Sequence, residues 1–458
     1  MTEADVLIIG SGQAGAPLSW RLAGAGNEVV LAERGELGGT CVNTGCTPTK
    51  TFIAAAEAAH RARVAERLGV DVDGVHVDMA RVVARTRDVV RTWRAGVERK
   101  VEEAGDGLRL VRGHARFVGP RTVEVGGQHF TAPVVIVNTG CRPRVPALRG
   151  LSDVPFLTNR NALQLQQLPE HLVVLGGGYV GCELGQAFRR LGSQVTVVQS
   201  SPHVLAREDP DVSEALEGAL REEGMTLRLG ARAVSVHRPG GGGVSVALDD
   251  GTQVSGSHLL VAAGRVPNTD DLGCREAGVT LDERGYVVVD DRYATSAEGV
   301  YAVGDCTGGP QFTHASWDDH RILFQLLRGN TRRTRADRLV PHATFTDPQV
   351  ARVGLSEGEA RRNGVAYDVG TVPFSGVSRA YETDRTAGRI KVLVGRDDGR
   401  ILGACVVGAE AAELVTVFQM LMMAEAPAQV LVDAEMIHPA FVEGVQSALM
   451  SIPRYALS

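Results

Sequence analysis

Two cysteines, Cys41 and Cys46, have a spacing that suits redox chemistry, and they closely follow a glycine-rich turn. A thiolate is the reactive form of cysteine, and a nearby cation or helix N-terminus lowers its pKa. On a regular helix their Cα atoms would lie roughly 8 to 9 Å apart, beyond the reach of a disulfide. If the two cysteines pair, the helix must be distorted or start late, and Gly45 and Pro48 are consistent with either. Two free cysteines that merely pack are the alternative interpretation.

The preceding turn has the spacing of a dinucleotide-binding motif. An apolar run over Asp5–Ile9 predicts a strand, and a helical pattern over Ala16–Ala25 follows the turn. The glycines of the turn are Gly10, Gly12 and Gly15. Glu33 ends a second apolar run, close to the roughly 20-residue offset of the acid that binds a ribose 2′-hydroxyl. The glycines would let backbone N–H groups approach a pyrophosphate at the positive end of the helix.

The same arrangement occurs again 166 residues later. Leu172–Leu175 is an apolar run, a helical pattern covers Glu183–Leu191, and a strand is expected over Gln194–Val198. The second turn contains Gly176, Gly178, Tyr179 and Gly181. Gln199 stands where the first copy has Glu33, so this position carries no charge. One such turn is weak evidence, but two with equal internal spacing predict two bound dinucleotides, with chance glycine turns as the alternative.

Composition excludes several classes of protein. The 458 residues suffice for about three domains, and 44% hydrophobic with 22% charged residues is ordinary for a globular protein. The net charge is −6 and no long basic run appears, so no nucleic-acid partner is expected. No stretch reaches the roughly 18 apolar residues of a membrane span, and no secretory signal is recognisable, so no membrane association is expected. We therefore expect a cytoplasmic protein, whose seven cysteines are not structural staples.

Further elements must position these residues. Two long helical patterns, Lys50–Leu68 and Asp78–Glu103, lie between the glycine motifs, and strands are expected over Leu259–Gly264 and Gly299–Asp305. From about Val340, a last domain alternates strands with an apolar helix. Its expected elements are Ile390–Val394, Ile401–Val407 and Ala411–Ala424. The pattern predicts an α/β fold with two Rossmann-like dinucleotide-binding domains.

The segment Gly38–Lys50, which holds both cysteines, resembles the redox-disulfide segment of the flavin-dependent pyridine nucleotide-disulfide oxidoreductases. This family includes dihydrolipoamide dehydrogenase, glutathione reductase and mercuric reductase. Other segments stand in the family's order along nearly the whole chain, namely Thr139-Gly140, Gly264–Asn268, Gly304-Asp305, Thr346–Pro348 and His438–Glu443. Phe312–Asp319 and Arg207–Pro210 are most similar to the mercuric-reductase-like bacterial branch.

The resemblance implies a division of the chain into four segments. Residues 1–150 would form an FAD-binding domain, and residues 151–270 would form an NAD(P)-binding domain. Residues 271–339 would return to the FAD or central domain. Residues 340–458 would form an α+β dimerisation domain. No resident metal ion is implied.

By the same resemblance, FAD is expected on the first glycine turn and NAD(P)H on the second. The residues implied for FAD are Gly10, Gly12, Gly15, Glu33, Gly39, Thr40, Lys50, Thr139, Gly140, Gly304 and Asp305. Those implied for NAD(P)H are Gly176, Gly178, Tyr179, Gly181, Gln199, Ser200, Arg207 and Gly264. Tyr179 would cover the nicotinamide pocket, with a packing aromatic as the alternative. Gln199, near Ser200 and Arg207, favours NADPH over NADH because it removes a carboxylate that would repel a 2′-phosphate.

The resemblance further implies a redox relay. Hydride would pass from nicotinamide to flavin to disulfide, with Cys46 next to the flavin and Cys41 exchanging with the substrate. Lys50 would lie near flavin N5 and pair with Glu183. A solvated lysine is the alternative interpretation of Lys50, which is one of only three lysines in the chain.

His438 and Glu443 match the family's C-terminal acid/base pair, in which the glutamate orients the imidazole. In relatives this histidine reaches the other subunit's disulfide, so a homodimer with shared active sites is implied. The histidine favours a small or protein-linked disulfide as substrate. The chain ends Ser451–Ser458 without the vicinal cysteines of well-known mercuric reductases, and it starts at the FAD strand without a metal-carrier domain. Hg(II) or another oxidising metal ion is the alternative substrate, because thiolates suit soft ions.

Other functional classes are also open. The chain could be the dihydrolipoamide dehydrogenase subunit of an acyl-transfer complex, although Gln199 stands where such enzymes normally have an acid. A docking component of such a complex and a non-catalytic flavin sensor are further alternatives. The complete set of relay residues argues against a sensor.

Overall fold

The computed structural model describes residues 2–330 and 332–456. Its first main sheet has five parallel strands in the order β18-β8-β2-β3-β4. Their bounds are β2 Val6–Ile9, β3 Val29–Glu33, β4 Leu108–Arg112, β8 Val134–Val137 and β18 Val300–Ala302. Along β2, Leu7 and Ile9 pack in one hydrophobic cluster, whereas Val6 and Ile8 pack in another. Both faces of the sheet are therefore buried, which explains the continuous apolar runs.

The second main sheet has four parallel strands in the order β12-β11-β10-β16. Their bounds are β10 His171–Leu175, β11 Gln194–Gln199, β12 Thr226–Leu229 and β16 His258–Val261. In both sheets a glycine turn leads from a strand into a helix, α1 (Gly15–Ala23) or α5 (Tyr179–Leu191). The sequence pattern predicts that this helix begins at Glu183, but α5 begins four residues earlier, at Tyr179. Gly181, the last glycine of the turn, therefore lies inside the helix. Two Rossmann-like units are present, as the sequence predicts.

Smaller sheets accompany the two units. A four-stranded sheet contains β1 Thr2–Glu3, β5 Ala115–Gly119, β6 Thr122–Val125 and β7 Gln128–Thr131. A three-stranded antiparallel sheet contains β13 Ala233–His237, β14 Val244–Leu248 and β15 Gln253–Gly256. A short antiparallel ribbon pairs β9 (Cys141–Pro143) with β17 (Arg265–Pro267). This ribbon joins the segment that follows β8 of the first unit to the segment that follows β16 of the second unit.

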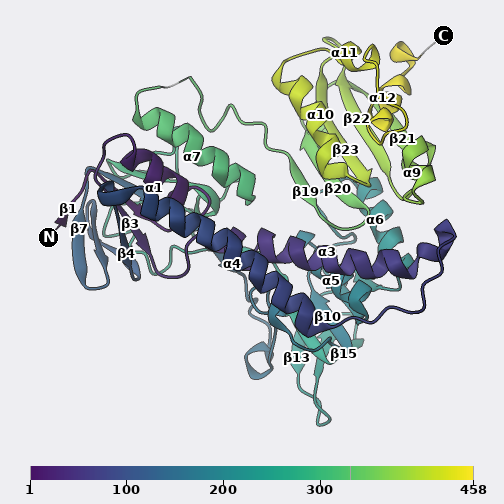
Figure 1. Ribbon diagram of the computed structural model, residues 1–458, viewed down its shortest axis with the longest axis horizontal. Helices are drawn as coiled ribbons and strands as arrows, with labels where there is room; N and C mark the ends of the chain where they lie inside the picture. The colour runs from purple at the N-terminus through teal and green to yellow at the C-terminus, as the bar shows by residue number, and fades with distance from the viewer. Residues whose placement is uncertain (1, 331, 457–458) are drawn as a thin grey trace.

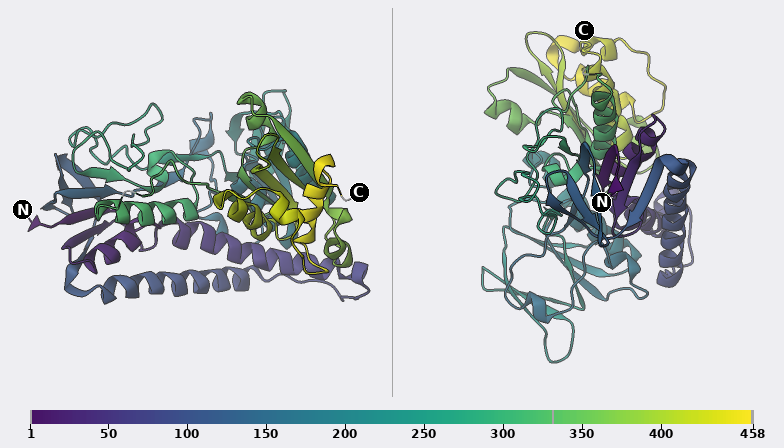
Figure 2. Two further views of the ribbon diagram at one scale, coloured as in Figure 1. Left: turned by 90° about the horizontal axis from the view of Figure 1, so that it is seen from above. Right: turned by 90° about the vertical axis from the view of Figure 1, so that its left-hand side faces the viewer.

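Two long helices, α3 (Cys46–Arg63) and α4 (Met79–Glu103), lie side by side along the molecule (Figures 1 and 2). α4 starts where expected, because the Asp78 side chain caps it by accepting a hydrogen bond from the Arg81 N–H at 3.0 Å. α3 starts at Cys46, four residues before the expected start, and ends at Arg63 rather than Leu68. It packs on α5 through Phe52 and Phe188, whose ring centroids are 5.1 Å apart.

The last part of the chain forms a separate lobe at the upper right of Figure 1. Its antiparallel sheet has the order β19-β20-β23-β22-β21. The strands are β19 His342–Thr344, β20 Gln349–Gly354, β21 Tyr367–Pro373, β22 Arg389–Gly395 and β23 Ile401–Gly408. α10 (Ala411–Met423) packs on β20 and β23, and α12 (Glu443–Met450) packs on β21 and β22. This lobe is α+β, as expected.

The remaining helices connect these parts. They are α2 Gly39–Thr44, α6 Pro210–Glu222, α7 Thr313–Leu327, α8 Glu357–Arg362, α9 Ser378–Glu382 and α11 Gln429–Val432. The C-terminal lobe is tied to the second unit by Lys391, which is buried and bonds both Asp209 and Asp211 at 2.8 Å. Within the described residues, no helix has both the length and the apolarity that crossing a membrane requires.

Candidate active site

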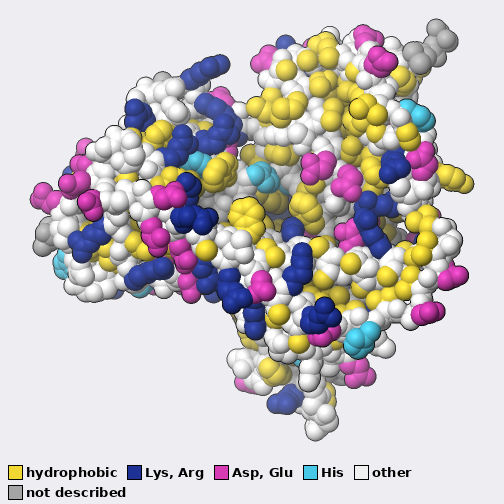
Figure 3. All heavy atoms as spheres, viewed as in Figure 1, with side chains coloured by type: hydrophobic (Ala, Val, Ile, Leu, Met, Phe, Trp, Pro, Cys, Tyr) yellow, Lys and Arg dark blue, Asp and Glu magenta, His cyan; other side chains and the backbone are white. Residues whose placement is uncertain are grey.

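A cavity of about 910 Å³ lies where the two Rossmann-like units and the C-terminal lobe meet. Figure 3 shows the surface hollowed between the lobe that carries α7 and the C-terminal lobe. Residues implied for FAD and for the relay line this cavity, namely Gly10, Gly12, Glu33, Gly39, Thr40, Cys41, Cys46, Lys50, Thr139, Gly140, Glu183 and Asp305. The cavity therefore gathers side chains that lie far apart in the sequence.

Cys41 and Cys46 lie on different helices. α2 ends at Thr44, Gly45 has φ −123° and ψ −117°, and α3 starts at Cys46. A Cβ on Gly45 would lie 2.8 Å from the backbone oxygen of Thr40, so glycine is required at this break. The helix is therefore interrupted between the two cysteines, as their pairing would require, and both are in the thiol form in this structure.

Cys46 is poised as a thiolate. A hydrogen bond from the Cys41 thiol, together with the Thr313 hydroxyl and the Lys50 cation, lowers the pKa of Cys46 to about 6. The same hydrogen bond to Cys46, with burial, raises the pKa of Cys41. The surroundings of the pair therefore favour a thiolate on Cys46 over one on Cys41.

Thr313 contacts the cysteine pair, and sequence reasoning did not predict it. Its hydroxyl oxygen lies 3.0 Å from Cys46 Sγ, and it stands in the first turn of α7, a helix of 15 residues. The unpaired N–H groups and positive end of such a helix favour a nearby anion. The available signal is the Phe312–Asp319 segment, which indicates a branch of the family but assigns no role to its threonine.

Lys50 and Glu183 form an ion pair at the cavity wall. Lys50 Nζ donates to both carboxylate oxygens, at 2.8 and 3.0 Å. Glu183 is only 3% exposed and also accepts the Phe345 backbone N–H at 2.8 Å. The lysine Nζ lies 4.7 Å from the Phe345 ring centroid. The structure thus brings together the pair that the sequence implied, and it keeps a cation close to Cys46.

The first glycine turn fits the pyrophosphate of a dinucleotide. Gly10 has φ +99°, and a Cβ on it would lie 2.4 Å from the Asn138 backbone oxygen. A Cβ on Gly39 would lie 2.7 Å from the Gly12 Cα. The turn thus leaves only backbone surface for a ligand to approach.

Two buried polar groups at this site, the Thr139 hydroxyl and the Asp305 carboxyl, lack close hydrogen-bond partners among the described side chains. Thr139 Oγ1 is buried and makes no hydrogen bond within the described structure. Burial raises the pKa of Asp305, although Arg265 lies 3.7 Å away. A buried hydroxyl and a desolvated carboxyl both gain from a bound partner with donors and acceptors. These residues fit FAD, which supplies hydride transfer when bound.

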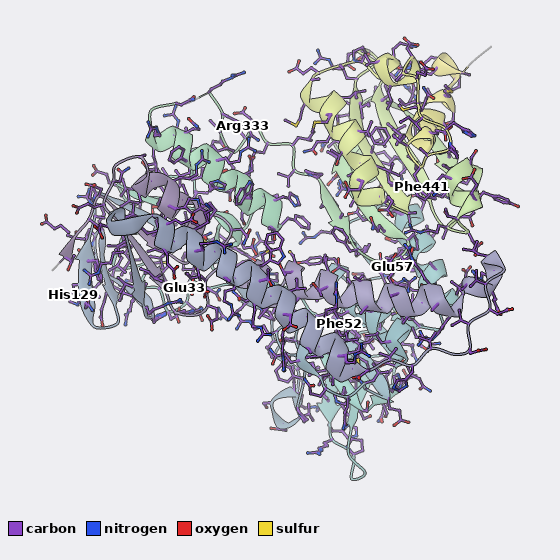
Figure 4. All side chains as sticks on the ribbon, viewed as in Figure 1. Glu33, Phe52, Glu57, His129, Arg333 and Phe441 are labelled. Carbon is purple, nitrogen blue, oxygen red and sulfur yellow. The ribbon has the colours of Figure 1, made fainter. Side chains whose placement is uncertain are left out.

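Glu33 is held by the turn it follows. Its Oε2 accepts the Ser11 backbone N–H at 2.8 Å and the Ser11 hydroxyl at 2.7 Å, and its Oε1 accepts the Gly35 N–H at 2.7 Å. Figure 4 labels Glu33 below α4 in the lobe of the first sheet. The carboxylate is thereby fixed at the edge of the cavity. A carboxylate that binds a ribose hydroxyl needs such a fixed position.

The second glycine turn lies outside the large cavity. Gln199 takes the place of Glu33, and its Oε1 accepts the Gly177 N–H at 3.0 Å. Ser200 and Arg207 are exposed nearby. The residues of this set that do not line the cavity are Gly176, Gly178, Gly181, Gln199, Ser200, Arg207 and Gly264. Tyr179 does line it, with its ring 6.2 Å from that of Phe312, and burial raises its pKa.

His438 and Glu443 form a pair that is remote from the cavity of their own chain. His438 Nδ1 lies 2.9 Å from Glu443 Oε1, and Glu443 Oε2 accepts the Ala440 N–H at 2.8 Å. These hydrogen bonds lower the pKa of Glu443, with that from Ala440 acting most strongly. His438 is 67% exposed and does not line the cavity. Its Nε2 is therefore free to face another molecule.

Comparison with known proteins identifies the family. Residues 4–319 match the model of the pyridine nucleotide-disulphide oxidoreductases, and residues 340–449 match the dimerisation domain of the same family. The chain belongs to this family. It is a flavoprotein oxidoreductase of the disulfide reductase type, in which hydride passes from NAD(P)H through FAD to a redox-active disulfide.

Individual relatives cover nearly the whole chain. A mercuric reductase of Streptomyces lividans is 36% identical over 91% of this chain and 89% of its own length. A dihydrolipoyl dehydrogenase of Thermus scotoductus is 35% identical over 100% of this chain and 99% of its own length. The Cu(II) complex of the HOCl-induced flavoprotein disulfide reductase RclA from Escherichia coli is 32% identical, with a TM-score of 0.90 over 98% of this chain and 99% of that one. The resemblance to the mercuric-reductase-like branch is thus supported by sequence, while the solved structures show the same fold in the disulfide reductase RclA.

Proposed function

We propose that this oxidoreductase reduces a small or protein-linked disulfide through Cys46 and Cys41. The observation that carries the proposal is the setting of Cys46, whose Sγ lies 3.0 Å from the Thr313 hydroxyl oxygen and near the Cys41 thiol and the Lys50 cation. These groups lower the pKa of Cys46, with the Cys41 thiol acting most strongly. A low pKa keeps Cys46 ionised, while Cys41 is left as the exchanging thiol. In the balanced reaction, NAD(P)H and one proton reduce one disulfide to two thiols.

The four segments and the individual roles form part of the same proposal. Residues 1–150 and 271–339 hold FAD, residues 151–270 hold NAD(P)H, and residues 340–458 pair the subunits. Lys50 and Glu183 position the cation beside Cys46, on the evidence of their hydrogen bonds. Gly304 holds the turn that presents Asp305, since its N–H donates to Asp319 at 2.7 Å.

We further propose a homodimer in which His438 of one subunit serves the cysteine pair of the other. The exposed imidazole, held by Glu443 through Nδ1, supports this role because its free nitrogen can take and return a thiol proton. A chain that carries the family's dimerisation domain has the means to bring the two together. A cytoplasmic location, where thiol substrates are kept reduced, agrees with this chemistry.

NADPH is the proposed electron donor. Gln199 is neutral, so it does not repel a 2′-phosphate, and the exposed Ser200 and Arg207 can donate to that group. The side chain of Gln199 also spans the turn, with its Nε2 3.4 Å from the His203 oxygen.

A metal ion is the second candidate substrate. Hg(II) is the substrate named for several relatives, and a solved relative is a Cu(II) complex. A paired thiol and thiolate suit such soft or oxidising ions. A dihydrolipoyl dehydrogenase role is the third candidate, and copurification in a very large particle would favour it.

An anaerobic titration of the yellow protein with NADPH, and separately with NADH, tests these proposals. We expect a long-wavelength thiolate-to-flavin absorbance band with NADPH that an added disulfide discharges. If only Hg(II) or Cu(II) discharged this absorbance band, a metal ion would become the first candidate substrate. Bleaching of the flavin without such a band would exclude Cys46 as its neighbour, and the relay would be wrong.

A further inference from the structure

A second hollow, of about 510 Å³, adjoins the large cavity and has no part in the proposed relay. It lies between α4, the end of α2 and the segment Thr158–Gln164. The two hollows share four lining residues, which are Asn43, Thr44, Asn159 and Arg160. A ligand in this second hollow would therefore lie beside the active site without entering it.

Arginine dominates the lining of this hollow, which we call the arginine groove. Four arginines line it, namely Arg87, Arg91, Arg94 and Arg160. Asp88 is the one acid among the lining residues, in a chain whose net charge is −6. Figure 3 shows Lys and Arg side chains, with some acids between them, along the face that α4 presents. The positive charge is thus gathered locally, where it would attract an anion.

Two of the four guanidinium groups are already engaged. Arg91 bonds Asp88, and Arg94 donates from Nε to Asn43 Oδ1 at 2.8 Å and pairs with Glu36 at 3.4 Å. Within the described parts of the chain, the guanidinium groups of Arg87 and Arg160 have no hydrogen bond or ion pair to another side chain or to the backbone. The groove therefore offers two unused planar donor groups, which match the oxygens of phosphate or carboxylate.

Arg160 also lies in a crowd of like charges. Burial lowers its pKa, and the nearby Arg265, Arg34 and Arg142 lower it further. Arg265, Arg34 and Arg142 are themselves paired with Asp305, Asp271 and Asp270. Arginine stays charged at any physiological pH, so among the described residues Arg160 is the member of this group that still lacks an acidic partner.

The floor of the groove is the segment that joins the two cysteines. Asn43 donates from Nδ2 to the backbone oxygens of Leu37 and Gly39, both at 2.9 Å. Asn159 donates from Nδ2 to the Thr44 oxygen at 2.7 Å, at the end of α2. Asn43 and Thr44 are thus rigidly held between Cys41 and Cys46.

We propose that the arginine groove binds a small polyanion that carries phosphate or carboxylate groups, against the segment joining Cys41 and Cys46. Its volume exceeds that of a single inorganic anion, so the ligand bears at least two oxyanion groups on a small frame. Arg87 and Arg160 hold two of these groups, whereas Arg91 and Arg94 stay paired with Asp88 and Glu36 at the edge of the groove.

Calorimetric titration of the FAD-loaded protein with pyrophosphate, and separately with citrate, tests this site. The holoprotein is used so that the large cavity is filled and cannot take up the probe. The variant is Arg87→Gln, and the matched control is Arg81→Gln, since Arg81 lies on the same helix, is exposed and does not line the groove. Arg87 has no part in the relay, so disulfide turnover of this variant serves as a check that it folds.

We expect one binding site per chain, with an affinity that Arg87→Gln weakens by about tenfold or more and that Arg81→Gln changes by less than about twofold. Tighter binding of pyrophosphate than of citrate would identify a phosphorylated ligand, and the reverse would identify a polycarboxylate. Equal losses in the two variants would mean diffuse attraction to α4 and would overturn the site. Absence of saturable binding of both probes at low ionic strength would overturn it as well.

Discussion

The two glycine turns share their backbone geometry but differ in what surrounds them. A Cβ on Gly15 or on Gly181 would lie 1.9 Å from the carbonyl oxygen of the first glycine of its turn. Glu33 and Gln199 each accept a hydrogen bond from the second residue of their turn, at 2.8 and 3.0 Å. The same local sequence thus builds the same loop twice.

The difference lies in a single asparagine. Asn138 Oδ1 accepts the Gly15 N–H at 2.8 Å, and a Cβ on Gly12 would lie 2.9 Å from the same oxygen. A Cβ on the equivalent Gly178 would meet no described atom within 4 Å, so the second turn is open. A closed, polar turn suits a dinucleotide that stays bound, whereas an open turn suits one that must leave after every turnover.

The largest expected effects come from matched substitutions in the two turns. Gly15→Ala forces a Cβ against backbone, which costs about 3 kcal/mol, so we expect FAD affinity to fall by about 100-fold. In Gly181→Ala the new Cβ clashes with the Gly176 carbonyl oxygen in the same way. We expect this variant to keep its FAD, and so its yellow colour, and to lose affinity for NADPH instead. Flavin content and nucleotide binding of the two purified proteins measure this. Loss of flavin from both variants would show that the turns are not separate sites.

A second substitution separates the relay from nucleotide oxidation. In Cys46→Ser, we expect disulfide turnover to fall by about 1,000-fold or more, because the ionised thiol is removed. NADPH oxidation by quinones should persist, since it needs the two dinucleotides but not the cysteine pair. Steady-state assays with both acceptors test this prediction. In Cys41→Ser, turnover should also fall, but the long-wavelength band should remain, and its disappearance would reverse the roles of the two cysteines.

Exchange of the two turn acceptors tests nucleotide choice. Gln199→Glu should lower kcat/KM for NADPH by about tenfold relative to NADH, because the carboxylate repels a 2′-phosphate. The reciprocal Glu33→Gln should leave the ratio of kcat/KM for NADPH and NADH unchanged and should weaken the binding of FAD. An unaltered NADPH to NADH ratio in Gln199→Glu would mean that the second ribose lies elsewhere.

Local sequence patterns predict the repeated parts of this molecule well. The glycine turns, Glu33 and Gln199 lie where their spacing places them, because a strand, turn and helix are specified by neighbouring residues. The break between Cys41 and Cys46 likewise follows from local geometry.

Features that depend on distant segments are harder to predict. Asn138 and Thr313 reach the two sites from other strands and helices, at separations of 123 and 267 residues. Neither has a spacing rule that links it to its partner. The start of α3 at Cys46 also differs from the prediction, since the sequence pattern shows the apolar face of the helix but not its first turn.

The smallest predicted effect concerns Thr313, which contacts Cys46 and has no contact with the second glycine turn among the hydrogen bonds of the described residues. The hydroxyl stabilises the Cys46 thiolate, so Thr313→Val should raise the pKa of Cys46 from about 6 by about one unit. Cys46 is ionised at pH values above its pKa and protonated below it. With a higher pKa, the variant should contain less thiolate than the parent protein between about pH 6 and 7, and the same amount above about pH 8. The pH dependence of the long-wavelength band in two-electron-reduced protein measures this. The conservative Thr313→Ser should restore the parent profile, and a uniform loss at every pH would instead indicate a structural role.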